Sequence, residues 1–283
     1  EKEAVSRLIK RNRDWGLSDA VMLDAEEARA VEPSLSPSVL GAGYSPSEGS
    51  INPFNITLGF AEAASRKGAH ISVQTEVTGF RPSSGRVEEI LTTAGPIKAD
   101  AFVIATGAWT RGLARLLNLD LPVYYHRGEA MITSPVKPVL KGIVTDGMFF
   151  LKKAKTSGRH YGAAMAQTKD GGIVLAQATS DVENYDRRST YWGVHVVAKR
   201  VCRLFPGFAG FEIVRSWGGV TPYTDDSLPL FGFLKSHPNV FVSASFHSAI
   251  AISPQIGMMA ADLITEGKTF RDVSVFHPSR YGL

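Results

Sequence analysis

The chain has 283 residues, of which 44% are hydrophobic and 20% are charged, and its formal net charge is +4. This composition is typical of a globular protein, and the length allows one large or two modest domains. The basic residues are scattered among acidic ones, so the charge gives no reason to expect a nucleic-acid partner. No apolar run reaches the length of about 18 residues that spans a bilayer, and we expect no integral membrane segment.

The first quarter of the chain predicts short helices and a hairpin. Residues 1–15 form an amphipathic pattern, and residues 25–30 follow Asp24, a good N-cap for a short helix. A helix over 55–66 is expected to lead into a strand at 71–77. A hairpin around 83–85 and a strand at 87–92 come next.

A short apolar strand is predicted at residues 101–105, ending at Thr106-Gly107 and followed by a helix over about 108–117. A small residue and a glycine at the carboxyl end of a strand let a ligand approach the backbone closely. Ligands of open α/β sheets bind at such strand ends, near helix N-termini that favour phosphate. The alternative is a tight turn from strand to helix that binds nothing.

Longer strands, such as 128–133 and 173–178, dominate the chain from Val123 to about Val214, with one helix at 189–204 and a strand at 212–216. This change of pattern predicts a second domain built on an antiparallel sheet. The only cysteine, Cys202, lies in that helix, where a buried and inert thiol is expected. A single cysteine excludes an internal disulfide and fits a reducing compartment, so we expect a cytoplasmic protein.

Five blocks carry a family resemblance. They are residues 23–52 (LDAEEARAVEPSLSPSVLGAGYSPSEGSIN), 99–109 (ADAFVIATGAW), 167–177 (QTKDGGIVLAQ), 217–232 (WGGVTPYTDDSLPLFG) and 243–257 (SASFHSAIAISPQIG). In this order they resemble the FAD-dependent superfamily of D-amino-acid oxidase, glycine oxidase and the sarcosine oxidase β subunit. Each block alone is unspecific, but the ordered set covers nearly the whole chain.

One part of the family pattern is missing. Such enzymes begin with a strand, a Gly-x-Gly-x-x-Gly turn and a helix whose N-terminus binds the FAD pyrophosphate. This motif does not occur in the chain, which starts at Glu1 rather than at a methionine. The resemblance therefore implies an absent N-terminal segment that carries the ADP half of the flavin site.

The implied fold is α/β (α+β), with an incomplete Rossmann-like FAD-binding domain interleaved with an antiparallel-sheet substrate domain. Residues 1–122 and 217–283 are assigned to the FAD-binding domain, and residues 123–216 to the substrate domain.

The resemblance also implies which residues bind FAD. Val77 would contact the adenine through its backbone, and the second block would line the ADP or ribityl region. The fifth block would supply a loop against the flavin pyrimidine, residues 248–252 before Pro254, where N–H groups at a helix N-terminus stabilise negative charge. A buried apolar turn is the alternative for that block. The implied cofactor-binding residues are Val77, Thr106, Gly107, Ala108, Trp109, Ser248, Ala249, Ile250, Ala251 and Ile252.

The fifth block departs from the family pattern in three places. Ala244 and Ser245 replace a common Gly-His pair, and Ala249 replaces a glycine. A methyl group in place of a glycine hydrogen crowds the space expected for the isoalloxazine ring. No cysteine lies near the fourth block, so we expect FAD to be held without a thioether bond.

The fourth block also departs from the family at the substrate anchor. Glycine oxidase and D-amino-acid oxidase relatives carry an arginine before the proline of this motif, and it binds the substrate carboxylate bidentately. Thr221 stands at that position here, and a threonine cannot replace a guanidinium fork. Relatives without this arginine include subunits of sarcosine oxidase, proline dehydrogenase and opine oxidase, whose typical substrates are secondary amines.

The residues predicted to bind substrate are Arg127, Thr221, Tyr223 and His247. Arg127 is the preferred replacement anchor, with a structural salt bridge as its alternative. His247 is either a pocket residue or a hydrogen-bonded core histidine. Asp225 and Asp226 are expected to cap backbone N–H groups in a turn rather than to act as acids.

No side-chain base is assigned, because amine oxidation in this family needs only hydride transfer from the neutral amine to flavin N5. The dispersed histidines give no metal-binding spacing.

The predicted function is FAD-dependent oxidation of the C–N bond of a secondary amine or imino acid, such as an opine, proline or a sarcosine-like compound. Two alternatives stay open. One is a glycine or D-amino-acid oxidase with an altered anchor, and the other is a truncated subunit that binds no flavin. The heteromeric relatives imply a partner subunit and a hetero-oligomer, and the absent motif implies, as the alternative, a missing N-terminal segment.

Overall fold

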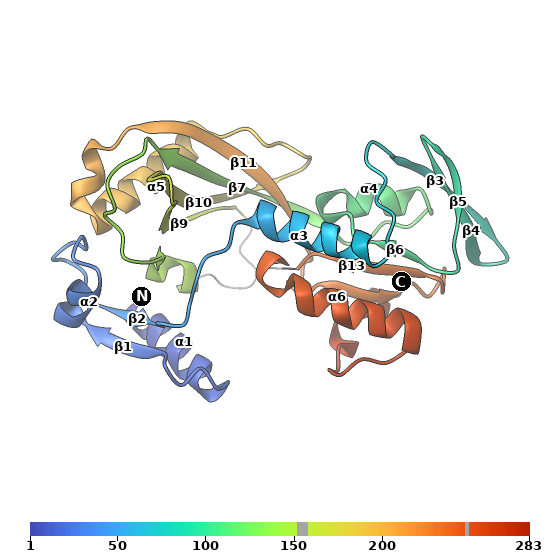
Figure 1. Cartoon of the computed structure of the whole chain (residues 1–283), viewed down its shortest axis with the longest axis horizontal. Coiled ribbons are helices and arrows are strands. Elements are labelled where there is room, and N and C mark those ends of the chain that lie inside the picture. Colours follow the sequence, from blue (N-terminus) through green and yellow to red (C-terminus); the bar gives the residue numbers. More distant parts are fainter. Residues whose placement is uncertain (152–157, 247–248) are drawn as a thin grey trace. The chain divides into compact units, whose positions relative to one another are not determined.

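The computed structural model describes residues 1–151, 158–246 and 249–283 (Figure 1). His247 and Ser248 lie outside these residues. The chain divides into two compact units. Unit 1 comprises Glu1–Ser50 and His126–Val220, and unit 2 comprises Ile51–Tyr125 and Thr221–Leu283. The later boundaries lie within a few residues of the predicted ones, whereas residues 1–50 belong to unit 1 instead of sharing a unit with residues 51–122.

The N-terminal part of unit 1 consists of two helices and a small antiparallel pair of strands. These are α1 (Lys2–Asp14), β1 (Val21–Asp24), α2 (Ala25–Val31) and β2 (Gly41–Tyr44). Asp24 caps α2 as predicted, because its carboxylate accepts hydrogen bonds from the N–H groups of Glu26 and Glu27.

Hydrogen bonds explain why this part groups with unit 1. Ser34 Oγ donates to the carbonyl of Val139 at 2.9 Å, and the buried Glu32 accepts from the N–H of Lys141 at 2.7 Å. In addition, α1 packs against the short helical turn η2 (Gly147–Leu151). No sequence pattern predicts such contacts between segments more than a hundred residues apart.

A five-stranded sheet in the order β11-β7-β10-β9-β8 forms the centre of unit 1. Its strands are β7 (Tyr124–Thr133), β8 (Val144–Thr145), β9 (Arg159–Gln167), β10 (Ile173–Val182) and β11 (Ile213–Tyr223). Helix α5 (Tyr191–Leu204) lies against this sheet (Figure 1). Its side chains Val197 and Val201 belong to the same buried cluster as Met131 and Met165. The predicted antiparallel character is confirmed for β9 with β10 and for β8 with β9. Cys202, expected to be buried, is half-buried.

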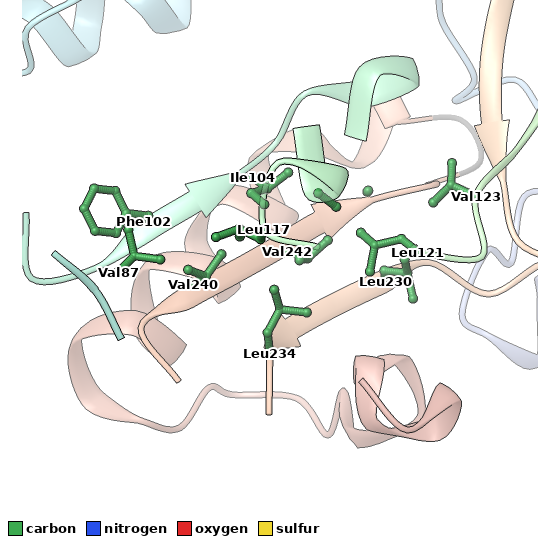
Figure 2. Packing of buried hydrophobic residues seen from close by; sticks show 12 residues of the cluster. Val87, Phe102, Ile104, Leu117, Leu121, Val123, Leu230, Leu234, Val240 and Val242 are labelled. Atoms are coloured by element: carbon green, nitrogen blue, oxygen red, sulfur yellow. The ribbon is translucent and has the colours of Figure 1, made fainter. Parts of the chain in front are cut away.

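Unit 2 contains a three-stranded sheet in the order β12-β13-β6. The strands are β6 (Phe102–Ile104), β12 (Leu230–Phe233) and β13 (Val240–Ala244). Their apolar side chains meet those of Leu117, Leu121 and Val123 in one core (Figure 2). Burying these aliphatic side chains is the main force that orders this part of unit 2.

A second sheet of unit 2 pairs β3 (Val77–Ser83), β4 (Arg86–Thr92) and β5 (Gly95–Lys98). The predicted hairpin is confirmed, since Ser83 pairs with Arg86 and the turn between them has positive φ at Ser84 and Gly85. The predicted strand at 71–77 is wrong. The left-handed backbone of Gln74, with φ of 53°, interrupts extended structure, and pairing begins only at Val77.

The described residues of unit 2 also form the helices α3 (Pro53–Arg66), α4 (Thr110–Arg115) and α6 (Ala249–Glu266). Asn52 caps α3 through its side chain, and Pro53 occupies the first turn. Four short 3₁₀ turns lie elsewhere: η1 (Gly107–Trp109), η3 (Pro206–Gly210), η4 (Ser274–Phe276) and η5 (Pro278–Tyr281). Among the described residues, no helix combines the length and the apolar character needed to cross a membrane.

Candidate functional site

The carboxyl ends of β6 and β13 coincide, because these strands are parallel with Ile104 opposite Val242. Thr106 follows Ile104 by two residues, and Ala244 follows Val242 by two residues. The second and fifth sequence blocks therefore leave the sheet at the same edge. Ligands of sheets with parallel strands bind at this edge.

The backbone at Gly107 is open. Its φ of +53° lies in the left-handed region, and a Cβ placed on it would meet no atom within 4 Å. The next residues form η1, in which Ala108 is buried and Trp109 is 60% exposed. The main chain after β6 is therefore unobstructed at Gly107, and the exposed Trp109 lies two residues further along the chain.

Helix α6 begins at Ala249, so the segment 249–252, expected to be a loop, is the first turn of a helix. The N–H groups of a first turn have no partner inside the helix and carry its positive dipole end. Ile250 and Ile252 stay 43% and 42% exposed. The expected N–H groups are present, but on a helix that starts earlier than predicted.

Pro254 lies inside α6, which obscured the start of this helix in the sequence. A proline has no N–H to donate to the carbonyl four residues earlier, which here is that of Ile250. Ser253 Oγ donates to this same carbonyl at 2.9 Å. The side chain of Ser253 thus replaces the missing backbone hydrogen bond, and the helix continues through the proline.

Ser245 follows β13 with φ of +63°, and its hydroxyl is buried without a hydrogen-bond partner. A buried hydroxyl that bonds nothing is unfavourable, so such an atom marks a place where a further group belongs. FAD has both polar and aromatic parts. It fits a site that combines the open backbone at Gly107, the exposed side chains of Ile250 and Ile252, and the unbonded hydroxyl of Ser245.

Val77 opens β3 in the other sheet of unit 2, where it is half-buried and pairs with Thr92. The structure thus brings together residues 106–109 and the approach to α6, whereas Val77 begins a separate element. Ser248, also predicted to bind the cofactor, lies outside the described residues, as does His247.

Arg127 on β7 makes ion pairs within unit 1. Its Nη1 donates to Asp186 at 2.8 Å and its Nη2 to Ser180 at 3.3 Å. Its Nε lies 3.5 Å from the buried Glu129, and the Arg127 side chain is only 11% exposed. This is the salt bridge given as the alternative in the sequence analysis. Anchoring of a substrate carboxylate by Arg127 stays a prediction, and one for which few free donors remain.

Thr221 and Tyr223 end β11 on the unit 2 side of the boundary. Thr221 is exposed, and the ring of Tyr223 packs at 5.7 Å against Tyr124. The Arg111 guanidinium of α4 lies 5.9 Å from the Tyr124 ring. Tyr223 is therefore linked through two contacts to the helix that follows Thr106–Trp109.

Arg111 is not free to bind a substrate carboxylate, since it donates to both oxygens of Asp120 at 2.8 Å. This bidentate hydrogen bond lowers the pKa of Asp120 to about 2.

Asp226 caps a turn, as predicted, by accepting from the N–H of Leu228 at 2.9 Å and from Thr224 Oγ1 at 2.9 Å. Arg280 near the C-terminus donates to the same carboxylate at 2.7 Å. Burial raises the pKa of Asp226, but the hydrogen bonds from Arg280, Leu228 and Thr224 together hold it far below its usual range. The side chain stays ionised and joins the C-terminal segment to the turn.

Two polar residues of β10 escaped the sequence interpretation. Gln177 is the last residue of the third block, and Thr179 follows it. The hydroxyl of Thr179 is buried without a partner. A glutamine at the end of a run of small and apolar strand residues was the available signal.

For metal ions, no group of His, Cys, Asp or Glu in the described ranges could hold one.

Comparison with known proteins extends these observations. The sequence pattern of the family described as FAD dependent oxidoreductase matches residues 1–263. Glycine oxidase of Geobacillus kaustophilus is 32% identical over 99% of this chain and 71% of its own length. Sarcosine oxidase subunit beta of Arthrobacter sp. is 26% identical over 81% of this chain and 55% of its own length.

A solved structure supports the same relationship. L-proline dehydrogenase from P. horikoshii superposes with a TM-score of 0.87 at 28% identity, covering 98% of this chain and 72% of that one. Its fold agrees with the α/β class predicted from the sequence. The chain therefore belongs to the family of FAD-dependent oxidoreductases, and FAD is its cofactor.

Proposed function

We propose that this protein oxidises the C–N bond of a secondary amine or imino acid, with FAD bound by unit 2. The observation that carries the proposal is the shared carboxyl edge of β6 and β13, where Gly107 leaves its backbone open and α6 starts a few residues beyond the strand.

The main chain from Thr106 to Trp109 and the first turn of α6 would hold the cofactor. When bound, FAD accepts two electrons from the carbon beside the amine nitrogen as a hydride. The N–H groups of Ala249 to Ile252 favour negative charge at the end of the helix, and the exposed Ile250 and Ile252 would cover the apolar part of the bound flavin and exclude water from it.

The substrate class rests on Thr221. A threonine at this point of the fourth block provides one hydroxyl, where a bidentate carboxylate anchor would need a guanidinium. L-proline dehydrogenase and sarcosine oxidase, whose names specify an imino acid and an N-methyl amino acid, are among the similar proteins. Tyr223 and His247 are further proposed substrate contacts.

Glycine oxidation is the second candidate, because a glycine oxidase is 32% identical to this chain. The two candidates differ in whether the amine nitrogen carries one carbon substituent or two. A secondary-amine site has to accommodate the second substituent.

An anaerobic titration distinguishes them. Proline, N-methylglycine and glycine are added in turn to the FAD-loaded protein, and loss of the oxidised flavin absorbance is followed. We expect proline or N-methylglycine to reduce the flavin faster than glycine does. Faster reduction by glycine would transfer the assignment to the second candidate, and no reduction by any amine would refute both.

A partner subunit, or a further segment that supplies the rest of the FAD site, is also proposed, as is a cytoplasmic location. The sarcosine oxidase relative is itself named as a subunit, which supports the proposal of a partner subunit.

A further inference from the structure

A row of polar side chains lies on the sheet face of unit 1 that points away from α5. Every second side chain of β7 faces α5. Glu129 does so because it accepts a hydrogen bond from Thr190, the N-cap of α5, and Met131 because it belongs to the core beneath that helix. Arg127 lies on the same face by strand alternation. Gly128 and His126 therefore face the other way.

Two contacts place β10 residues on this same face. A Cβ added to Gly128 would lie 2.5 Å from Gln177 Nε2, so the amide of Gln177 occupies the space above Gly128. His126 Nδ1 lies 2.7 Å from Asp181 Oδ1. Strand alternation then puts Thr179, between Gln177 and Asp181, on this face too, where it pairs across with His160 of β9.

The direction of Gln177 results from an irregularity in the sheet. Ala176 pairs with Ala164 and Ala178 with Tyr161, so Gln177 alone stands opposite two residues of β9. This shift lets Leu175 and Ala178, three residues apart, both enter the core beneath α5. Register irregularities of this kind redirect a side chain and are frequent beside active sites.

Neither Gln177 nor Thr179 makes a side-chain hydrogen bond within the described part of the chain. Gln177 is half-buried, and its amide bonds no residue in the described part of the chain. Thr179 is 8% exposed, and its Oγ1 is buried with no partner. A fold that leaves a buried hydroxyl unbonded gives up free energy unless another molecule supplies the bond.

We propose that Gln177 and Thr179 recognise the carboxylate of the substrate, and that Gln177 determines specificity for amines that carry one. The inference rests on the proposed function and deepens it, because it names the group that takes the role of the missing arginine. An amide N–H and a hydroxyl both donate to a carboxylate. The proposal does not involve Arg127, which lies on the opposite face of the sheet and bonds Asp186 and Ser180.

Gly128 is part of this arrangement. Any side chain there would displace the Gln177 amide, whereas the glycine leaves it room. Three substitutions therefore test the Gln177 donor in different ways. Gln177→Ala removes the donor, Gln177→Glu replaces it with a charge that repels a carboxylate, and Gly128→Ala moves the donor without removing it.

The test measures binding and turnover separately in the FAD-loaded protein. Binding is measured by calorimetry with methoxyacetate and tetrahydrofuran-2-carboxylate, in which oxygen replaces the amine nitrogen so that no oxidation follows. Turnover compares proline with pyrrolidine, which lacks the carboxylate. The control is Glu183→Gln, an exposed position directly after β10.

We expect Gln177→Ala to weaken binding of the carboxylates, and to raise KM for proline, by about tenfold or more, the loss typical of one hydrogen bond to a charged group. Gln177→Glu should lose more, and Thr179→Val should weaken binding without lowering the melting temperature. KM for pyrrolidine, and every value for the control, should stay as in the wild type.

The proposal is overturned if neither carboxylate binds the wild type, if Gln177→Ala binds them as tightly, or if proline and pyrrolidine lose affinity equally. A merely structural Gln177 would lower the melting temperature and leave the ratio of the two amines unchanged. Carboxylate binding that depends on Gln177, without flavin reduction by any amine, would uphold this inference while refuting the proposed function.

Discussion

Asp226 shows how single residues of this chain hold distant segments together. Its carboxylate accepts from Leu228 and Thr224 in its own turn and from Arg280 near the C-terminus. Sequence reasoning predicted the local part, because an aspartate followed two residues later by a free N–H is a common turn. It could not predict Arg280, since nothing in a linear sequence indicates that residues 54 positions apart will meet.

The pH dependence of stability follows from this carboxylate. Its pKa is lowered in the folded protein, so ionised Asp226 stabilises the fold at pH values above the unfolded pKa of about 3.9, and this contribution is lost as the pH falls below it. We expect Asp226→Asn to lower the urea midpoint at pH 7, and the difference from the wild type to shrink between about pH 5 and pH 3. Glu183→Gln controls for the loss of one charge, and a difference that grows in acid would contradict this account.

The substrate-binding residues named from the sequence stay predictions, and Gln177 is a proposal made from the structure. Arg127 was chosen because an arginine can grip a carboxylate, but that chemistry equally serves an ion pair with Asp186. Gln177 was passed over because a glutamine in a strand has no distinctive pattern, and its direction depends on a register shift visible only in three dimensions.

At the scale of elements, local signals predicted most helices and the hairpin. The caps at Asp24 and Asn52 begin helices within two residues of the predicted starts, and Ser84-Gly85 forms the expected turn. The start of α6 was misplaced because Pro254 suggested a loop, while Ser253 allows the helix to continue. The strand predicted at 71–77 failed because the left-handed backbone of Gln74 interrupts extended structure before pairing begins at Val77.

The turn between β6 and η1 gives a test of the cofactor site at this scale. Gly107 and Gly85 both have positive φ, and a Cβ on either would meet no atom of the chain. Replacing either with alanine should therefore cost a similar strain of about 1 kcal/mol. Only Gly107→Ala should weaken FAD binding, by at least tenfold, because only there would the methyl group enter the space assigned to the cofactor.

Fluorescence titration with FAD measures both affinities, and thermal unfolding measures both stabilities. Equal FAD affinities for Gly107→Ala and Gly85→Ala would show that the cofactor does not approach this backbone.

At the scale of the whole molecule, the sequence predicted the fold class and an interleaved arrangement, and the structure divides into two units that interleave along the chain. The change of strand length near Val123 is the signal on which the predicted domain boundary rests, and the two compact units divide between Tyr125 and His126. The membership of residues 1–50 was not predictable, since it depends on the bonds from Ser34 and Glu32 to residues 139–141.

Hydrogen–deuterium exchange with and without FAD tests the central claim most directly. If the flavin is held where β6 and β13 end, FAD should slow exchange at Thr106 to Trp109 and at Ala249 to Ile252, while the hairpin at Ser84-Gly85 exchanges as before. Unchanged exchange in both segments, with FAD-dependent protection elsewhere in the chain, would contradict the account.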